Sequence, residues 1–123
     1  QFDVATTNKA LETIVRNTQA QVQLIEDLLD VSRIVRGTLQ LNFASVNLEE
    51  VVEAAIETIR PVAEAKPLEL KTQLQSIAPI WGDFSRLQQV ILNLLTNSIK
   101  FTPAGGQVQV LLDWHNAGVR LQV

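Results

Sequence analysis

The sequence predicts an α+β fold, in which one long helix is followed by an α/β sandwich with a mixed sheet. Residues 7–36 contain neither glycine nor proline, and their apolar residues recur at alternating spacings of four and three. Residues 38–123 then alternate strand-like and helix-like patterns, which is typical of helices layered on a sheet. With 123 residues, of which 46% are hydrophobic, the chain is long enough for one modest domain with an appendage.

The composition excludes several classes of function. The net charge of −3 argues against nucleic-acid binding. There is no cysteine, which rules out disulfides, zinc–thiolate sites and thiol catalysis and fits a cytoplasmic location. No run approaches about 18 apolar residues, so we expect no membrane contact by this segment. A Ser-His-Asp triad would have to use His115, the single histidine.

The first 36 residues carry a heptad seam. Its members are Leu11, Val15, Thr18, Val22, Ile25, Leu29 and Ser32. A second apolar stripe widens the face and suits a helix bundle: Leu24, Leu28, Val31 and Val35. Gly37 is placed to end the helix as a left-handed cap, after Arg33 and Arg36 in the last turn. We expect a homodimer through residues 7–36, the alternative being an ordinary amphipathic helix.

The next segment should be strand, helix and strand. Residues 38–46 alternate as a strand, and Asn47 with Glu50 resembles a capping box. The expected helix spans 47–65, with a kink or an early stop at Pro61. A half-buried strand is expected over 68–74, and residues 77–81 form an edge strand or a connector.

The last segment opens with Asp83, a good N-cap, and a helix that runs to Phe101. A strand over 107–114, a turn at 116–118 and a returning strand at 119–123 complete the pattern. The helices over 47–65 and 83–101 should cover one face of the sheet. The two tryptophans, Trp81 and Trp114, are expected to be packing residues.

The helix over 83–101 carries a narrow polar stripe. At 100° per residue, five polar side chains share an arc of roughly 80°: Arg86, Gln89, Asn93, Asn97 and Lys100. The rest is mainly apolar and predicts a helix buried on most sides. Asparagine is a poor helix former, so a second role should compensate for it. An amide oxygen suits Mg²⁺ and lysine suits phosphate, which makes a nucleotide–metal site the hypothesis beside a plain solvated face.

The segment from Asp83 to Pro103 closely resembles the N box of bacterial sensor histidine kinases, whose Bergerat ATP-binding fold is shared with Hsp90, gyrase and MutL. Residues 24–33, followed by residues 37–41, resemble the end of the second helix of their dimerisation and histidine-phosphotransfer domain. The resemblance implies that residues 1–37 belong to that domain. It implies that residues 38–123 are the N-terminal part of the catalytic domain, ending before the glycine boxes.

The resemblance also assigns the site. It implies ATP and Mg²⁺ as cofactors, with Asn97 as the main metal ligand, Asn93 and Lys100 serving the metal and the phosphates, and Phe101 beside the nucleotide. Relatives that hydrolyse ATP carry a glutamate at the place of Asn93, and an amide cannot take a proton from water. The residue at this position therefore favours a kinase over an ATPase.

The whole protein is thus expected to phosphorylate a histidine for relay to the receiver domain of a response regulator. The family's H box is absent and His115 is a poor phosphoacceptor, so no catalytic residue is expected in this chain. We expect the isolated chain to bind Mg²⁺-ATP weakly at best and not to autophosphorylate. The acidic cluster of Glu26, Asp27 and Asp30 is either a solvated face or a contact with the response regulator.

Two alternatives remain open. The first is a degenerate module that only dimerises or docks a partner. The second is another Bergerat ATPase or an anti-sigma-type kinase, against which the long heptad helix argues.

Overall fold

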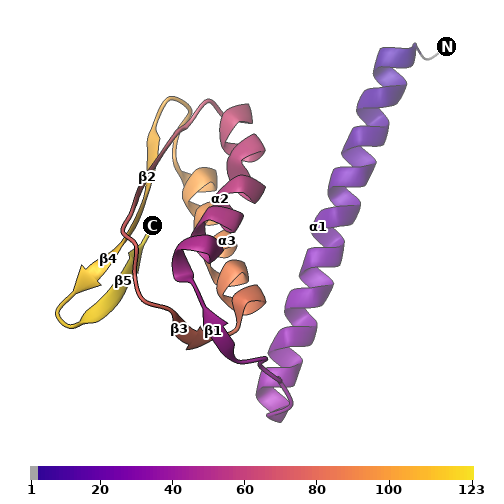
Figure 1. The fold of residues 1–123 in the computed structure, drawn as a ribbon. Helices are drawn as coiled ribbons and strands as arrows, with labels where there is room; N and C mark the ends of the chain where they lie inside the picture. Colours follow the sequence, from indigo (N-terminus) through magenta and orange to yellow (C-terminus); the bar gives the residue numbers. More distant parts are fainter. Residues whose placement is uncertain (1–2) are drawn as a thin grey trace. The chain divides into compact units, whose positions relative to one another are not determined.

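A computed structural model describes residues 3–123, and the chain divides into two compact units with the boundary after Gln40. The first unit contains one long helix, α1 (Val4–Arg36), which begins three residues before the predicted start at Thr7 (Figure 1). Asp3 caps it, because its Oδ1 accepts a hydrogen bond from the backbone N–H of Thr6 at 2.6 Å.

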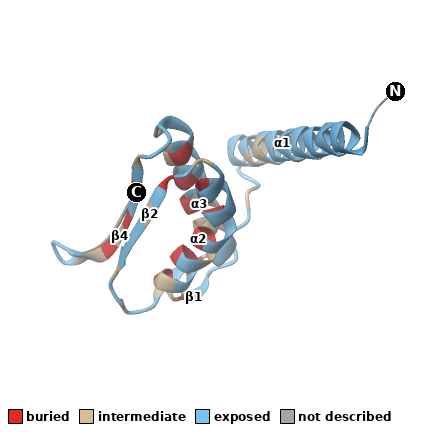
Figure 2. Ribbon diagram, turned by 90° about the horizontal axis from the view of Figure 1, so that it is seen from above, coloured by how far each residue is buried: buried red, intermediate tan, exposed pale blue. Residues whose placement is uncertain are grey.

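The C-terminal end of α1 follows the sequence prediction. Gly37 adopts the left-handed conformation with φ of 70°, and its N–H donates to the carbonyls of Arg33 and Ile34. The N–H of Thr38 also donates to the Arg33 carbonyl, at 2.8 Å. These bonds satisfy carbonyl groups that the end of a helix leaves without partners. No residue of α1 is buried (Figure 2), so its apolar stripes are exposed within the part of the chain that the structure describes.

The second unit is an α/β sandwich with seven elements. They are β1 (Ala44–Val46), α2 (Leu48–Ala65), β2 (Glu69–Leu74), β3 (Ile80–Gly82), α3 (Phe84–Phe101), β4 (Gln107–His115) and β5 (Gly118–Gln122). The three-stranded sheet has the order β2-β4-β5, with β2 parallel and β5 antiparallel to β4, so it is mixed as predicted. Strands β1 and β3 form a separate antiparallel pair. Both α2 and α3 lie on one face of the larger sheet (Figure 1).

The core of this unit lies between the two helices and the larger sheet, where Figure 2 shows the buried residues of α2, α3 and β4. Helix α3 contributes Ile91, Leu95 and Ile99, and alternate residues of β4 face them. The best-buried side chains are Val51, Val52, Ile91, Leu95, Val110 and Leu112. Their burial is the main favourable contribution to the stability of this unit.

The expected length of the first strand is corrected. The strand expected over 38–46 is only Ala44–Val46, because its partner β3 has only three residues. Strand β3 cannot be longer, since Pro79 before it has no N–H to donate and Asp83 after it caps α3. Helix α2 ends at Ala65, as predicted, and does not stop early at Pro61.

The prediction that the two tryptophans are packing residues was wrong. The side chain of Trp81 is 72% exposed and that of Trp114 is 50% exposed. Trp81 alternates with Ile80 and Gly82 in β3 and therefore lies on the outer face of the β1–β3 pair. Trp114 follows Leu112, the last buried residue of β4, and lies where the strand extends past the helices. No helix within residues 3–123 is long and apolar enough to cross a membrane.

Candidate functional site

Helix α3 positions every residue of the predicted site, and its two ends are defined by hydrogen bonds. At its start, Asp83 Oδ1 accepts from the backbone N–H of Arg86 at 3.2 Å. The other oxygen, Oδ2, accepts from the N–H of Asn42 at 2.9 Å, which joins the start of α3 to the residues before β1. At its end, the N–H and the hydroxyl of Thr102 both donate to the carbonyl of Ser98. Both ends of α3 are therefore fixed by hydrogen bonds, which fixes the positions of the side chains along the helix.

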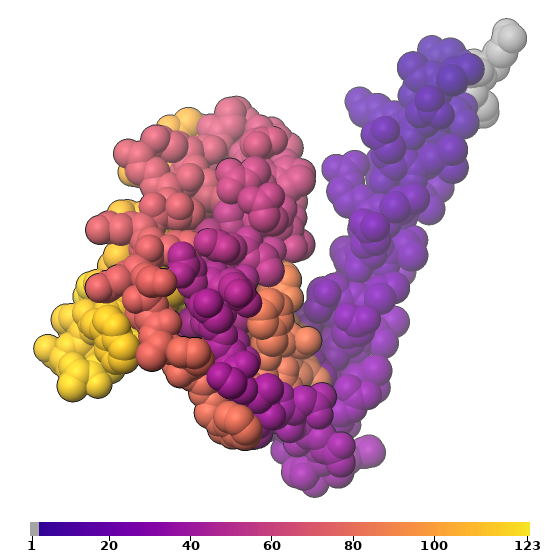
Figure 3. All heavy atoms as spheres, viewed as in Figure 1, coloured from indigo at the N-terminus to yellow at the C-terminus, as the bar shows by residue number. Residues whose placement is uncertain are grey.

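The side chains of Asn93, Asn97 and Lys100 are exposed on α3, as their helical spacing predicts. Atoms of α3, coloured orange, are visible at the surface of residues 41–123 in Figure 3. At the N-terminal end of the same stripe, Arg86 Nη1 donates to Gln89 Oε1 at 3.0 Å. The stripe thus continues from a guanidinium–amide pair to two exposed amides and an ammonium group, a set that suits anionic oxygens.

The prediction that α3 is buried on most sides was wrong. Val90 is 53% exposed and Leu94 is 45% exposed, and only Ile91, Leu95 and Ile99 of this helix are buried. At 100° per residue, Val90, Leu94 and Phe101 lie beside Asn97, roughly 60 to 100° from Asn93. The reason is that α2 and the sheet cover one side of α3, while the described residues of this unit leave this apolar ridge open. The polar stripe is therefore flanked by exposed apolar surface.

A pocket of about 530 Å³ lies at the C-terminal end of α3. Asn97, Ser98, Phe101 and Thr102 line it from the helix side. The remaining lining residues come from β4 and the end of the chain: Gln107, Val108, Gln109, Leu111, Gln122 and Val123. This volume lies within the usual range of small-molecule sites, roughly 300 to 1,000 Å³.

The pocket separates the predicted site residues into two groups. Asn97 and Phe101 line it, whereas Asn93 and Lys100 are on the exposed helix surface beside it. Lys100 is linked to the pocket through Phe101, because its Nζ lies 5.4 Å from the centre of the Phe101 ring. Sequence reasoning missed Gln107, Gln109 and Gln122. Their alternation with apolar residues indicated an outward direction but not the pocket they would line.

The donor set fits a nucleotide-bound metal better than a resident one. Residues 3–123 contain no group of three or more His, Cys, Asp or Glu residues that could hold a metal ion. Mg²⁺ bound with a nucleotide takes only one or two protein oxygens, the remainder being phosphate and water. The amide oxygens of Asn93 and Asn97 could meet that small requirement, and the Lys100 ammonium group could supply positive charge for phosphate.

The Asp83 cap gives α3 a dependence on pH. Hydrogen bonds from the backbone N–H groups of Asn42 and then Arg86 hold the pKa of Asp83 below its ordinary value of 3.8. Because the folded-state pKa lies below the unfolded value, the ionised carboxylate stabilises the fold above about pH 3.8. That stabilisation is lost as the pH falls through the lowered pKa.

We expect the free energy of unfolding, measured in urea between about pH 6 and about pH 3, to fall more steeply for the natural chain than for Asp83→Asn. The asparagine keeps a capping oxygen but has no proton to gain. Glu64→Gln, at an exposed site of α2, is the control and should follow the natural chain. Parallel curves for the natural chain and Asp83→Asn would contradict this role of Asp83.

Residues 82–123 match the family described as "Histidine kinase-, DNA gyrase B-, and HSP90-like ATPase". Over 118 residues, covering 89% of the chain, the sequence is 40% identical to the hybrid signal transduction histidine kinase D of Dictyostelium discoideum. The chain belongs to the histidine kinase family. Another relative is the non-motile and phage-resistance protein of Caulobacter vibrioides, with 44% identity over 92 residues, or 75% of the chain. The chain spans only 8% and 11% of the lengths of these two relatives.

Solved histidine kinases share the fold. The histidine kinase AdeS of Acinetobacter baumannii matches 98% of this chain with a TM-score of 0.79 and 21% identity, and the match covers 58% of AdeS. Full-length ShkA in complex with AMPPNP matches 98% of the chain with a TM-score of 0.75 and 26% identity, over 26% of ShkA. ThkA in complex with the response regulator protein TrrA matches 98% of the chain with a TM-score of 0.68 and 20% identity, over 35% of that kinase.

Proposed function

We propose that this chain is the part of a sensor histidine kinase that binds Mg²⁺-ATP along α3. In the whole protein, the γ-phosphoryl group would pass to a histidine for relay to a response regulator. The observation that carries the proposal is the placement of Asn97 and Phe101 at one pocket, with Lys100 beside Phe101. Support comes from ShkA, which is 26% identical and was solved with AMPPNP, an ATP analogue.

The proposal gives each site residue a separate task. The Oδ1 atoms of Asn97 and Asn93 would coordinate the metal, and the Lys100 ammonium group would contact phosphate oxygens. The ring of Phe101 would lie against the nucleotide at the pocket. Bound Mg²⁺-ATP supplies the transferable phosphoryl group, so the residues of this chain have only to hold and orient it.

Asn93 favours phosphoryl transfer over hydrolysis. A general base must accept a proton, and a neutral amide does not do so near neutral pH. Water near this position would not be activated by Asn93, which leaves the phosphoryl group for another acceptor.

The proposed acceptor is not His115. This residue ends β4 beside the turn, and its Nε2 lies 3.3 Å from Asn116 Nδ2. It is not among the residues that line the pocket. We therefore propose that residues 38–123 belong to the ATP-binding domain and that the histidine which receives the phosphoryl group belongs to another part of the kinase.

We further propose that residues 1–37 belong to the dimerisation domain and that the chain forms a homodimer through residues 7–36. The apolar stripes of α1 support this assembly, because the helix has no buried residue. The proposal places the segment in the cytoplasm, where ATP is available.

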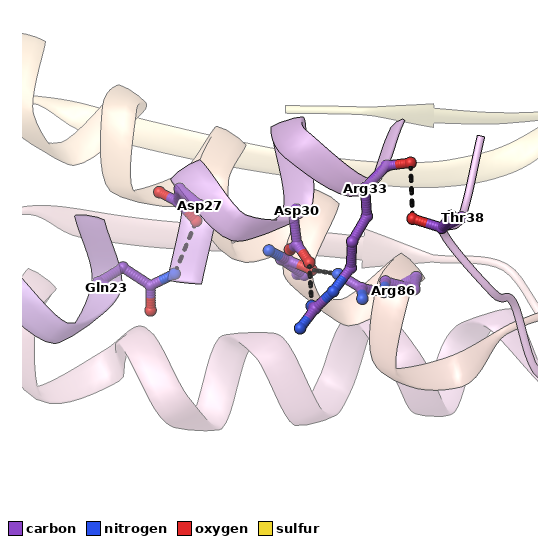
Figure 4. A network of polar contacts seen from close by, with 7 residues as sticks. Gln23, Asp27, Asp30, Arg33, Thr38 and Arg86 are labelled. Carbon is purple, nitrogen blue, oxygen red and sulfur yellow. Dashed lines mark hydrogen bonds and ion pairs between the residues drawn. The ribbon is translucent and has the colours of Figure 1, made fainter. Parts of the chain in front are cut away.

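A response regulator would meet the acidic cluster of α1 formed by Glu26, Asp27 and Asp30, a partnership supported by the kinase–regulator complex of ThkA. In α1, Asp27 accepts from Gln23 at 2.9 Å and Asp30 from Arg33 at 3.4 Å, and the Arg33 carbonyl accepts from the Thr38 hydroxyl at 3.3 Å (Figure 4). The bonds from Gln23 and Arg33 hold the side chains of Asp27 and Asp30 in place beside the exposed Glu26.

An NMR titration of the chain with Mg²⁺-ATP tests the nucleotide proposal. We expect the amide signals of residues 93–102 to shift, with a dissociation constant of about a millimolar, because these residues supply few preorganised contacts. ATP with EDTA in place of Mg²⁺ is the control and should give smaller shifts. Shifts spread evenly over α1 and the sheet, or none at all, would contradict the proposal and favour a module that only dimerises or docks a partner.

A further inference from the structure

Lys66 follows α2 directly and reaches across to the end of α3. Its Nζ donates to the carbonyl oxygen of Ile99 at 2.7 Å and to that of Lys100 at 3.1 Å. Ile99 and Lys100 lie 33 and 34 positions after Lys66 in the sequence, so the contact joins the end of α2 to the end of α3. The side chain of Lys66 is half-buried, which shields the two bonds partly from water.

The sequence of α3 explains why this ammonium group is needed. In an α-helix the carbonyl of residue 99 would accept from the N–H of residue 103, but Pro103 has no N–H. The carbonyl of Lys100 lies in the last turn and also lacks a helical partner. Lys66 supplies a donor to both oxygens, and its positive charge lies at the negative end of the helix dipole.

Backbone hydrogen bonds join the loop that follows α2 to the loop that follows α3. The N–H of Gly105 donates to the carbonyl of Pro67 at 3.0 Å, and the N–H of Glu69 donates to that of Gly106 at 3.0 Å. A Cβ added at Gly106 would lie 2.6 Å from the Thr102 side chain and 2.9 Å from the Pro103 carbonyl, so the loop is tightly packed. The ammonium group of Lys66 therefore acts within a fixed junction between the loops that follow α2 and α3.

We propose that Lys66 is a positioning residue for the nucleotide site. It acts through the Ile99 and Lys100 carbonyls, which fix the last turn of α3. That turn carries Lys100 and Phe101, and Asn97 lies one turn before it. Lys66 itself has no contact with nucleotide in this proposal, which rests on the Mg²⁺-ATP site proposed above.

The test is a titration of the Lys66→Met variant with Mg²⁺-ATP. Binding is monitored by NMR at a temperature well below the unfolding transition of the variant. Methionine keeps the length of the side chain but removes all three donors. We expect affinity to fall about fivefold or more, because the contacts of the last turn are no longer preorganised. Amide hydrogen exchange at Phe101 and Thr102 should become faster in the same variant. Lys66→Arg should retain most of the affinity, since it keeps a charged donor.

Asn47→Ala is the matched control for stability. It removes the N-cap of α2, where Asn47 Oδ1 accepts from the N–H of Glu49 at 3.1 Å, and leaves the end of α3 intact. If Asn47→Ala weakens nucleotide binding as much as Lys66→Met, the effect of Lys66 is one of general stability and the inference is overturned. Lys66→Leu, which also has no donor, replaces Lys66→Met should the latter not fold.

Asn97→Ala separates the inference from the proposed function. If Asn97→Ala weakens binding and Lys66→Met does not, positioning by Lys66 is wrong and the nucleotide site stands. If the natural chain binds no nucleotide, or binds it equally well with Asn97→Ala, the proposed site itself fails and the role of Lys66 fails with it.

Discussion

Alanine in place of Asn97 is expected to weaken Mg²⁺-dependent ATP binding about tenfold or more, equal to about 1.4 kcal/mol. A nucleotide-bound Mg²⁺ takes only one or two ligands from the protein. Loss of the Asn97 ligand would therefore remove much of the binding between the metal and the protein. Asn97 is exposed and lines the pocket, so the substitution leaves no buried cavity. Alanine is also the better helix former, and the variant should be at least as stable as the natural chain.

Calorimetric titration with Mg²⁺-ATP, and with ATP in EDTA, measures this effect. The difference between the two titrations should shrink in Asn97→Ala, and thermal unfolding should show no loss of stability. Asn8→Ala, which removes an exposed asparagine from α1, should leave both titrations unchanged. Equal Mg²⁺-dependent binding by the natural chain and Asn97→Ala would show that Asn97 is not a ligand of the bound metal.

The proposed homodimer is expected to become a monomer when Val22 and Leu29 are replaced together by glutamate. The two residues share the heptad face of α1 and are 48% and 49% exposed. Burying an aliphatic side chain contributes roughly 1.5–3 kcal/mol, and each dimer would lose four of them and gain four charges. We therefore expect the dissociation constant of the dimer to rise at least about a thousandfold.

Sedimentation equilibrium over a range of concentrations gives that constant directly. The control is Ala20→Glu with Gln23→Glu, which adds the same charge at exposed positions of α1 about 100 to 160° away from Val22 and keeps good helix formers. The control should remain dimeric. A monomeric natural chain, or a double variant that remains dimeric, would contradict an interface on the heptad face.

Local chemistry in the sequence determined most of the elements. Asp83 and Asn47 were recognisable as N-caps and Gly37 as a left-handed cap, and the structure places all three in those roles. The reason is that caps and turns depend on residues within about four positions of one another. The exposed row of Asn93, Asn97 and Lys100 was predictable in the same way, because helical spacing alone places them on one face.

Only the tertiary structure decided which faces are covered. Periodicity made Val90 and Leu94 look like core residues, and the lack of a stacking platform in the sequence around them made Trp81 and Trp114 look like packing residues. All four are substantially exposed. A pattern shows which residues share a face, but not whether another element lies against that face.

The same distinction holds at the site. The sequence by itself determined the residue types that can hold a metal and phosphate, through the spacing of Asn93, Asn97 and Lys100 on one helix. The tertiary structure decided that Gln107 and Gln109 share a pocket with Asn97, and that Lys66 donates to the end of α3. Both facts depend on the packing of β4 and α2 against α3. Such packing joins residues far apart in the chain, and local propensity and periodicity contain no information about those distances.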